Sequence, residues 1–265
     1  MLLNPVLPTI PFEADGDALI AASIVSHGHG KMVSQLVSQL LECKEISRVI
    51  ITLNLPENLC LPEDDERVEV IRNTFPLGFG ENHNQAFQRI GEVYFCPLNP
   101  DIALLGNPFA KLVAAMEHSD SEISAPRVVS PEGHPEDSVR GFPTFPGLIA
   151  KVLRISSGQL QFYAHSESFH PDWVAGMFML FRSDAYAALG GFDERFFLYY
   201  EDVDICVRAW RAGMKVVVCP SVSVVHDAQR DSHRSLRHLR WHLASMARYF
   251  VKHFGRLPRV DRLVQ

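Results

Sequence analysis

Apolar and polar positions alternate along the first hundred residues with two different periods. Apolar runs typical of buried strands, such as 19–25 and 48–53, are separated by segments such as 32–42, in which apolar residues recur every three or four positions. Further elements expected here are strands at 68–71 and 93–98 and a helix at 82–90. Strands that alternate with short helices predict a mostly parallel sheet flanked by helices.

The pattern is less regular after residue 105. The later elements that it predicts are a helix near 107–118, strands near 122–129 and at 173–181, helices at 184–189 and 202–213, and two strands, 215–219 and 222–226, joined by Pro220 and Ser221. The Gly- and Pro-rich segment 131–147 and the stretch 156–172 are typical of loops over a sheet rather than of linkers. We expect an N-terminal extension over 1–17, one domain over 18–233 and a tail over 234–265.

The tail contains a basic amphipathic helix, expected over 234–256. Its apolar stripe consists of Leu236, Leu239, Leu243, Met246 and Phe250, and its arginines lie largely elsewhere on the helix. The simpler interpretation is a terminal helix that docks on the domain through this stripe. The second interpretation adds attraction to an anionic membrane surface or to a phosphorylated acceptor, and the two can hold together.

Composition places the chain among ordinary globular proteins. Of its 265 residues, 47% are hydrophobic and 21% are charged. No run approaches the roughly 20 apolar residues that span a bilayer, and residues 1–17 lack the basic and apolar regions of a cleaved signal peptide. A cytoplasmic location is the resulting expectation. The five widely spaced cysteines favour reduced thiols and offer no CxxC zinc site.

Charge divides the chain into two parts. Residues 227–265 carry a net +6, whereas residues 1–226 carry −12, which gives the overall −6. A basic tail could suit nucleic acid, but the acidic body and the absence of a recognition-module pattern disfavour that class of partner.

The first candidate chemistry lies at the end of the strand expected at 93–98. Asn99 and Asp101 follow it, at the sheet edge where ligands of such sheets bind. Asp101 could simply be a turn or cap residue, or it could hold Mg²⁺ or Mn²⁺ together with substrate phosphates. Upstream, Gly78 and Gly80 would let a backbone approach a ligand closely, although two loop glycines alone are a weak signal.

The second candidate is an acidic cluster at the start of a predicted helix. Glu201, Asp202 and Asp204 follow the aromatic run FFLYY. Acids are favoured in a first helical turn because the helix dipole attracts negative charge, so a solvated helix start is the simple interpretation. The other interpretation is that one of the three is a catalytic base, with Asp204 structural.

Five segments together resemble inverting family 2 glycosyltransferases of the GT-A fold, especially rhamnosyltransferase-like members of bacterial polysaccharide assembly. The resemblance covers roughly residues 20–250. The segments are PLGFGENHNQ (76–85), LNPD (98–101), WVAGMFMLFR (173–182), GGFDERFFLYYEDVDICVRAWRAG (190–213) and VVH (224–226). The implied structure is α/β, a single Rossmann-like GT-A domain with a mostly parallel sheet and a C-terminal amphipathic helix.

The resemblance implies roles for individual residues. Asp101 would ligate the Mg²⁺ or Mn²⁺ that bridges the donor diphosphate, and His226 would complete that site, although a lone histidine is often structural. Asp202 would be the catalytic base. Trp173 and Gly176 would line the sites of donor sugar and acceptor. The remaining positions matched to donor binding are Ser26, Asn54, Gly78, Gly80, Asn84 and Asn99.

The implied reaction is a single displacement. One carboxylate removes the proton of an acceptor hydroxyl while that oxygen attacks the anomeric carbon, and the metal neutralises charge on the departing nucleoside diphosphate. Glu201 is the alternative base, or it orients the acceptor or tunes Asp202. The implied partners are a nucleotide-diphospho-sugar and a glycan or lipid-linked glycan acceptor, at the inner face of the cytoplasmic membrane.

Two positions depart from the family pattern. The second strand ends in Asn54 where the family has an acid, and the first ends in SHGHG (26–30) rather than Thr-Tyr-Asn. An amide can hydrogen-bond a ribose but cannot act as an ionised acceptor. The departure motivates an alternative, a glycosyltransferase-like binding module without turnover. A nucleotidyltransferase is a third reading, disfavoured because no Gly-rich triphosphate loop with a lysine lies near the N-terminus.

Overall fold

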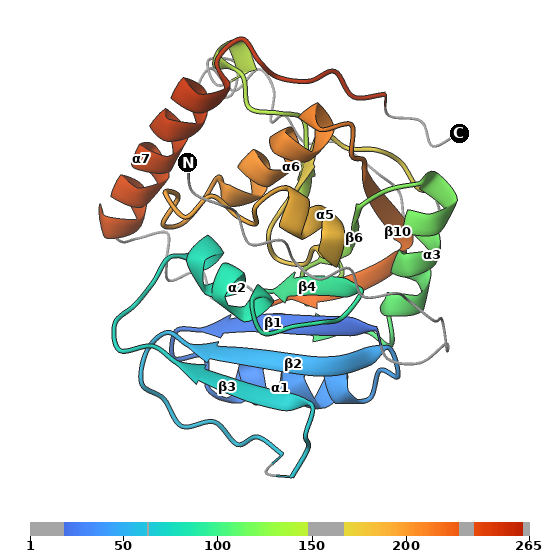
Figure 1. Cartoon of the computed structure of the whole chain (residues 1–265), viewed down its shortest axis with the longest axis vertical. Helices are drawn as coiled ribbons and strands as arrows, with labels where there is room; N and C mark the ends of the chain where they lie inside the picture. The colour runs from blue at the N-terminus through green and yellow to red at the C-terminus, as the bar shows by residue number, and fades with distance from the viewer. Residues whose placement is uncertain (1–18, 63, 148–166, 228–235, 262–265) are drawn as a thin grey trace, which may run out of the picture.

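The computed structural model describes residues 19–62, 64–147, 167–227 and 236–261. Its centre is an eight-stranded sheet with the strand order β3-β2-β1-β4-β9-β6-β10-β5 (Figure 1). The strands are β1 (Ile20–Ser26), β2 (Ile46–Leu53), β3 (Val68–Arg72), β4 (Tyr94–Leu98), β5 (Ile102–Leu104), β6 (Ile123–Val129), β9 (Leu180–Arg182) and β10 (Val216–His226). The expected extension, residues 1–17, lies outside the described residues, as do residues 156–166.

The sheet is mostly parallel, as predicted. Strands β3, β2, β1 and β4 run in one direction, and β6 pairs in parallel with β10. The short strand β9 joins these two groups and is antiparallel to both neighbours, and β5 is antiparallel to β10 at the edge. The parallel strands therefore bring their carboxyl ends to one side, where β1 ends at Ser26 and β2 and β4 lead into the loops that carry Asn54 and Asn99.

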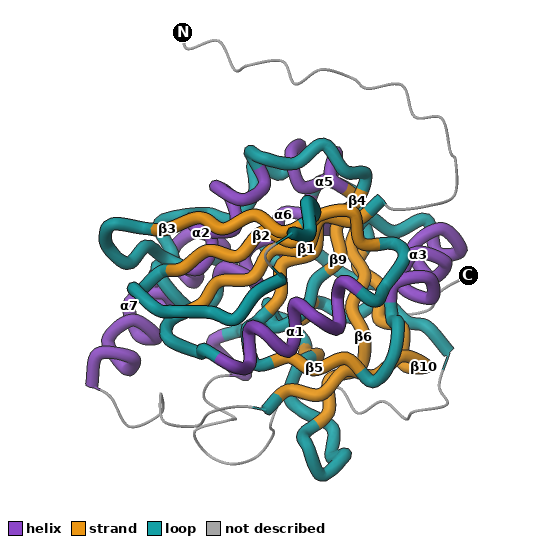
Figure 2. Tube along the Cα trace, turned by 90° about the horizontal axis from the view of Figure 1, so that it is seen from below, coloured by secondary structure: helices purple, strands orange, loops and turns teal. Residues whose placement is uncertain are grey.

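Helices cover both faces of the sheet. They are α1 (Lys31–Leu41), α2 (Phe79–Phe87), α3 (Phe109–Ser119), α5 (Ser183–Ala188), α6 (Glu201–Arg211) and α7 (Leu236–His253). Helix α1 buries Val33, Leu36, Val37 and Leu40, one face at helical spacing, against the same core cluster as α3. Figure 2 shows α1 across the near face of the sheet, and the core of the opposite face includes residues of α5 and α6.

The segment expected as one strand over 173–181 is in fact divided between two sheets. Its start is β8 (Trp173–Val174), which pairs with β7 (Val139–Arg140), and its end is β9 in the main sheet. Both parts are apolar because both are buried, so periodicity alone could not separate them. The intervening residues cross from one sheet to the other and include Gly176.

The two strands expected at 215–219 and 222–226 form the single strand β10. Its register against β6 shifts between Cys219 and Ser223. Pro220 cannot donate a hydrogen bond to the ladder, and a bulge accommodates such a residue without ending the strand. The strand therefore continues to His226, beside β5.

Helix α7 docks on the domain, but not through its leucines. Its buried residues are Ser245, Tyr249 and His253, whereas Leu236, Leu239 and Leu243 are exposed. The expected apolar stripe therefore docks only in its second half, where Phe250 packs against the core and Met246 is partly buried, and its three leucines do not take part. Polar residues are buried because the helix meets charged groups of α6, where His253 Nε2 lies 2.7 Å from Asp204 Oδ1. Figure 1 shows α7 at the margin of the molecule.

Candidate active site

The backbone is unusual directly before α6. Tyr199 and Tyr200 both adopt left-handed conformations, with φ of 70° and 69°, which cost roughly 1–3 kcal/mol each for residues other than glycine. Side chains of α7 support both residues. The Tyr199 hydroxyl lies 3.2 Å from His238 Nδ1, and the Tyr200 ring packs 5.3 Å from that of Tyr249. The chain thereby enters α6 with its first two acids beside a cavity.

Asp202 is held by backbone donors. Its Oδ2 accepts a hydrogen bond from the Gly176 N–H at 3.0 Å, and its Oδ1 accepts one from the Val203 N–H at 2.8 Å. Burial raises the pKa of Asp202, and the two hydrogen bonds oppose that rise because they favour the charged form. The carboxylate is thus fixed in orientation, and it forms no ion pair within the described part of the chain.

Glu201 is more deeply buried, with 5% of its surface exposed. Its Oε2 has no hydrogen-bond partner among the described residues. Burial, and next the negative charge of Asp202, raise the pKa of Glu201 well above its usual range. Two adjacent carboxyl groups push their pKa values apart, and here the pKa of Glu201 is the one raised further.

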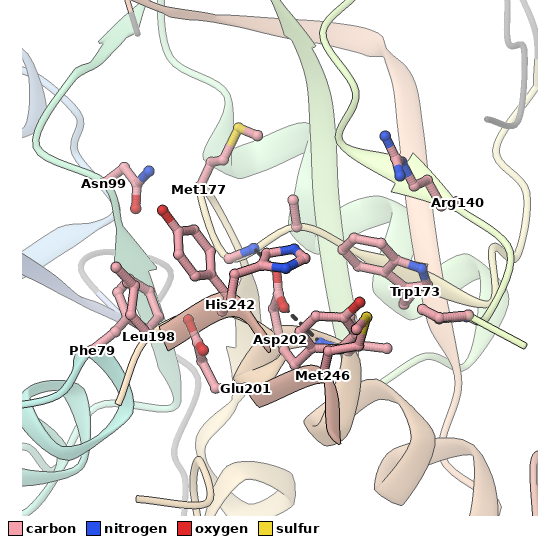
Figure 3. Close-up of a pocket in the computed structure, with 16 residues that line it drawn as sticks. Phe79, Asn99, Arg140, Trp173, Met177, Leu198, Glu201, Asp202, His242 and Met246 are labelled. Carbon is pink, nitrogen blue, oxygen red and sulfur yellow. Dashed lines mark hydrogen bonds between the residues drawn. The ribbon is translucent and has the colours of Figure 1, made fainter. Parts of the chain in front are cut away.

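A cavity of about 630 Å³ lies in front of these acids, a size within the usual range of ligand pockets. It brings together five residues predicted from the sequence, namely Asn99, Trp173, Gly176, Glu201 and Asp202. Figure 3 shows them contributed from separate parts of the fold, with Asn99 after β4, Trp173 from β8 and the acids from α6. Residues from β7, β8, the start of α6 and α7 thus meet at the end of β4.

Asp101 and His226 form a pair where β5 meets β10. The Asp101 Oδ2 lies 3.3 Å from His226 Nε2, and the Asp227 N–H donates to the Asp101 carbonyl at 2.9 Å. Burial lowers the pKa of His226, but hydrogen bonding to Asp101 and its charge outweigh this and raise the pKa overall. Neither residue belongs to the lining of the cavity before Asp202.

Two polar atoms of this pair are left without a partner. Asp101 Oδ1 and His226 Nδ1 are buried and make no hydrogen bond to any described residue. No group of three or more His, Cys, Asp or Glu side chains that could hold a metal occurs in residues 19–62, 64–147, 167–227 and 236–261. A carboxylate and an imidazole nevertheless fit a Mg²⁺ or Mn²⁺ that takes its other ligands from substrate phosphates and water.

Asn54 and Ser26 are buried at the ends of β2 and β1. The Asn54 amide donates to the Leu77 carbonyl at 2.9 Å and accepts from the Leu77 N–H and from Asn73 Nδ2, both at 2.8 Å. Ser26 Oγ accepts from the His29 N–H at 3.3 Å. Both side chains therefore fix the loops around them, and a contact between the Asn54 amide and a ligand would require one of these hydrogen bonds to be exchanged.

Gly78, Gly80 and Asn84 lie against the segment that leads to α6. A Cβ at Gly78 would lie 2.9 Å from the Phe197 carbonyl oxygen, and one at Gly80 would lie 2.6 Å from the Phe192 Cβ. Asn84 Nδ2 donates to the Phe192 carbonyl at 2.9 Å, and its Oδ1 accepts from the Phe192 N–H at 2.9 Å. At Gly78 and Gly80 the backbone therefore approaches another part of the protein closely, rather than a ligand. Neither glycine nor Asn84 lines the cavity.

Sequence reasoning missed several residues of the cavity wall. They are Arg140 from β7, Tyr199 and Tyr200 before α6, and His242 and Met246 from α7. The aromatic run next to Glu201 was a signal for the tyrosines. No local pattern could identify the α7 residues, because their position depends on how that helix docks.

Three comparisons with known proteins bear on this site. A model of the family described as glycosyltransferase like family 2 matches residues 61–244. Rhamnosyltransferase WbbL of Escherichia coli K12 is 29% identical over 244 residues, which are 86% of this chain and 91% of that protein. The N-acetylglucosaminyl-diphospho-decaprenol L-rhamnosyltransferase of Mycobacterium tuberculosis H37Rv is 29% identical over 183 residues, which are 60% of this chain and 58% of that protein.

Solved structures share the fold at low identity. A crystal structure of GalNAc-T7 with UDP, GalNAc and Mn²⁺ has a TM-score of 0.63 at 16% identity, covering 82% of this chain and 45% of the other. The mannosyltransferase PcManGT from Pyrobaculum calidifontis, in complex with GDP-Man and Mn²⁺, has a TM-score of 0.57 at 14% identity, covering 87% and 64%. Both support the predicted fold class, a single α/β domain of the GT-A type.

Proposed function

Because the chain belongs to the family described as glycosyltransferase like family 2, we propose that it is an inverting, metal-dependent sugar transferase. The donor is a nucleotide-diphospho-sugar, with rhamnose as the first sugar to test. The acceptor is a hydroxyl of a glycan carried on a lipid diphosphate, and the product belongs to cell-surface polysaccharide synthesis. The observation that carries this proposal is the Asp202 carboxylate, oriented by two backbone N–H groups at the wall of a ligand-sized cavity.

Asp202 is the base of the proposed reaction. The acceptor hydroxyl gives its proton to the Asp202 carboxylate while its oxygen forms a bond to the anomeric carbon. The bond between that carbon and the diphosphate oxygen breaks with its electron pair, and the nucleoside diphosphate leaves from the opposite face of the sugar. The raised pKa of Asp202 favours this role, because a stronger base takes the proton more readily.

Glu201 supports the reaction in its protonated form. A buried neutral carboxyl group can donate a hydrogen bond, which a carboxylate cannot do. Its Oε2 has no partner in the described chain, so an acceptor hydroxyl is a suitable one. Glu201 as the base is the alternative, and it would require ionisation of the more buried group of the pair.

Asp101 and His226 would hold the divalent cation, Mg²⁺ or Mn²⁺. When bound, the cation supplies positive charge to the leaving diphosphate. The pair's unpartnered atoms, Asp101 Oδ1 and His226 Nδ1, support the assignment. Asn99 lines the cavity and lies two residues before Asp101, and it would offer its amide to the donor.

The donor and acceptor follow from the relatives. WbbL is named a rhamnosyltransferase, and the mycobacterial relative's name specifies an N-acetylglucosaminyl-diphospho-decaprenol acceptor. We assign the same classes of sugar and acceptor to this chain, at the cytoplasmic face of the membrane that holds the lipid. Among the described residues no helix is long and apolar enough to cross a membrane.

A binding module without turnover is the second candidate. It is favoured by one observation, the neutral and fully hydrogen-bonded Asn54 at a position where the family has an acid. Such a module would bind sugar nucleotides without releasing nucleoside diphosphate, whichever donor and acceptor were supplied.

A thermal-shift panel of nucleoside diphosphates and their sugars, with and without Mn²⁺, tests the donor and metal assignments. We expect the nucleoside diphosphate with the correct nucleobase, and its sugar, to raise the melting temperature only when Mn²⁺ is present. Asp101→Ala should abolish that metal-dependent rise. The matching donor is then combined with a lipid-diphosphate glycan, and release of nucleoside diphosphate is measured. Binding without release would favour the inactive module, and a metal-dependent shift unaltered in Asp101→Ala would contradict the metal assignment.

A further inference from the structure

The first half of α7 carries a strip of exposed leucines. Leu236, Leu239 and Leu243, which we call the leucine strip, are 80%, 54% and 48% exposed. Their spacing of three and four residues places them on one face of the helix. Single exposed leucines are common on protein surfaces, but aligned ones on a helix that already docks through Ser245, Tyr249 and His253 and through Phe250 in its second half point to a second partner.

Positive charge borders the leucine strip. Arg237 and Arg240 lie in the same turns, and α7 contains no Asp or Glu from Leu236 to His253. The rest of the chain is acidic, since residues 1–226 carry a net −12. Leucines beside arginines on one helix are the pattern of helices that lie in the surface of an anionic bilayer, with apolar side chains in the acyl boundary and arginines at the phosphates.

The other border of the strip is the wall of the candidate active site. His242 and Met246 each follow a strip residue, Leu239 or Leu243, by three positions, so they are its neighbours around the helix. Both line the cavity that contains Asp202, and Figure 3 shows His242 and Met246 on the same side of the cavity as Asp202. The cavity therefore opens beside the strip rather than on a remote face.

We propose that the leucine strip inserts into the surface of an anionic lipid bilayer and places the mouth of the cavity against that surface. A lipid-linked acceptor would then present its sugar to Asp202 without leaving the membrane. The presentation of the acceptor rests on the proposed function, which supplies the lipid-linked acceptor. The bilayer contact is argued only from the leucine strip, the arginines and the position of the cavity. A second copy of the chain is the competing occupant, since its acidic body could cover a basic helix.

Sedimentation of the full chain with vesicles tests the contact without any catalysis. The vesicles contain phosphatidylglycerol and phosphatidylcholine in equal parts. Changing all three strip leucines to Gln should weaken the vesicle partition coefficient by about tenfold or more, because the apolar area buried in the lipid is lost. The melting temperature should stay at the wild-type value, since none of the three side chains is buried in the protein.

A control changes two apolar residues elsewhere whose exposure lies within the range of the strip. Phe75 and Leu105, each 66% exposed, are replaced by Gln, and this variant should sediment like wild type. Arg237→Gln combined with Arg240→Gln should weaken binding to anionic vesicles and leave binding to pure phosphatidylcholine vesicles unchanged. Equal sedimentation of wild type and the leucine variant would overturn the proposal. So would a wild-type dimer that dissociates in the leucine variant while neither binds vesicles.

Transfer assays separate this proposal from the proposed function. With an acceptor embedded in vesicles, the leucine variant should lose about tenfold or more in kcat/KM, in proportion to its lost binding. With a short-chain, water-soluble acceptor, it should match wild type. Equal losses on both acceptors would contradict a membrane role for the strip, whereas no transfer by wild type to either acceptor would contradict the proposed function and leave the vesicle result standing.

Discussion

Asp202 and Asp204 stand two residues apart on one helix and have opposite surroundings. Asp204 is fully buried and contacts three side chains, those of Arg208 at 2.8 Å, His253 at 2.7 Å and Lys252 at 2.6 Å. Asp202 faces a cavity and is hydrogen-bonded only to backbone N–H groups of the described chain. Burial raises the pKa of both, but at Asp204 the hydrogen bond to His253 and the charges and hydrogen bonds of Arg208 and Lys252 outweigh burial and lower the pKa.

The difference shows how the same residue type acquires two roles in one helical turn. A carboxylate that is surrounded by cations has its charge neutralised and is useful as a tether, here between α6 and α7. A carboxylate with a raised pKa and an open side is able to take a proton. Asp204 therefore holds in place the helix that supports Tyr199 and Tyr200, and through them the position of Asp202.

The largest effect is expected from Asp202→Asn. An amide cannot accept the acceptor's proton, so we expect kcat to fall about 10²–10⁴-fold. Donor binding, measured by thermal shift with Mn²⁺, should remain. Wild-type transfer rates in this variant would contradict Asp202 as the catalytic base and would favour Glu201 in that role.

Asp204→Asn should act on stability instead. Removing one partner from a buried ionic cluster leaves the others uncompensated and costs about 3–5 kcal/mol. The free energy of unfolding, from urea titration, measures this loss. The control is Asp120→Asn, which breaks an exposed ion pair with Lys215 and should change stability by less than about 1 kcal/mol. An Asp204→Asn protein as stable as the control would remove the contrast between the two acids.

Asn84→Ala tests the support of α6 from the other side. The change removes hydrogen bonds to both backbone groups of Phe192 and to the Tyr186 hydroxyl, and it should cost about 1–3 kcal/mol in the free energy of unfolding. We also expect kcat to fall, because the segment from Gly191 to Tyr200 positions Asp202. Asn58→Ala, in an exposed loop, is the control. Unchanged stability together with weaker donor binding would instead make Asn84 a ligand of the donor.

Glu201→Gln should produce the smallest effect, and one that depends on pH. The pKa of Glu201 is raised above its ordinary 4.5 on folding, so the native state binds more protons than the unfolded state above that pH. Wild-type stability therefore falls as pH rises above about 4.5, whereas Gln is neutral throughout. The variant should melt higher than wild type at pH 7, by about 2–4 °C for each kcal/mol relieved. The difference should vanish below pH 4.5, and a constant difference across pH would contradict the raised pKa.

Much of the fold followed from periodicity. The strands β1, β2, β3 and β4 and the helix α1 lie within a few residues of their predicted ranges, because alternating layers leave a clear pattern in the sequence. The division of 173–181 between two sheets and the joining of 215–226 into one strand did not follow. Both features depend on which neighbouring strand provides the hydrogen bonds. The apolar pattern of a buried strand does not indicate which strand pairs with it.

The candidate site was predictable in part for a related reason. Asn99 and the two acids meet at one cavity, as expected from their positions after a strand and at a helix start, and Trp173 and Gly176, which the family resemblance implied, join them there. The glycines and Asn84 of the 76–85 segment were matched to ligand binding, yet the structure places them against residues 191–197. Glycines in a short sequence pattern indicate that something lies close to the backbone, but they do not specify whether it is a ligand or another part of the protein. The contribution of α7 could be read from the sequence only in part, because Met246 and Phe250 lay on the expected apolar stripe but the fully buried residues Ser245, Tyr249 and His253 did not.

The pH dependence of single-turnover transfer tests the central claim most directly. In wild type we expect the rate to rise with pH through one ionisation, at a pKa above the ordinary 3.8 of an aspartic acid. That ionisation should persist in the folded fraction of Asp204→Asn and disappear from the residual activity of Asp202→Asn. An unchanged pH profile in Asp202→Asn, or its loss in Asp204→Asn, would contradict the assignment of the proton to Asp202.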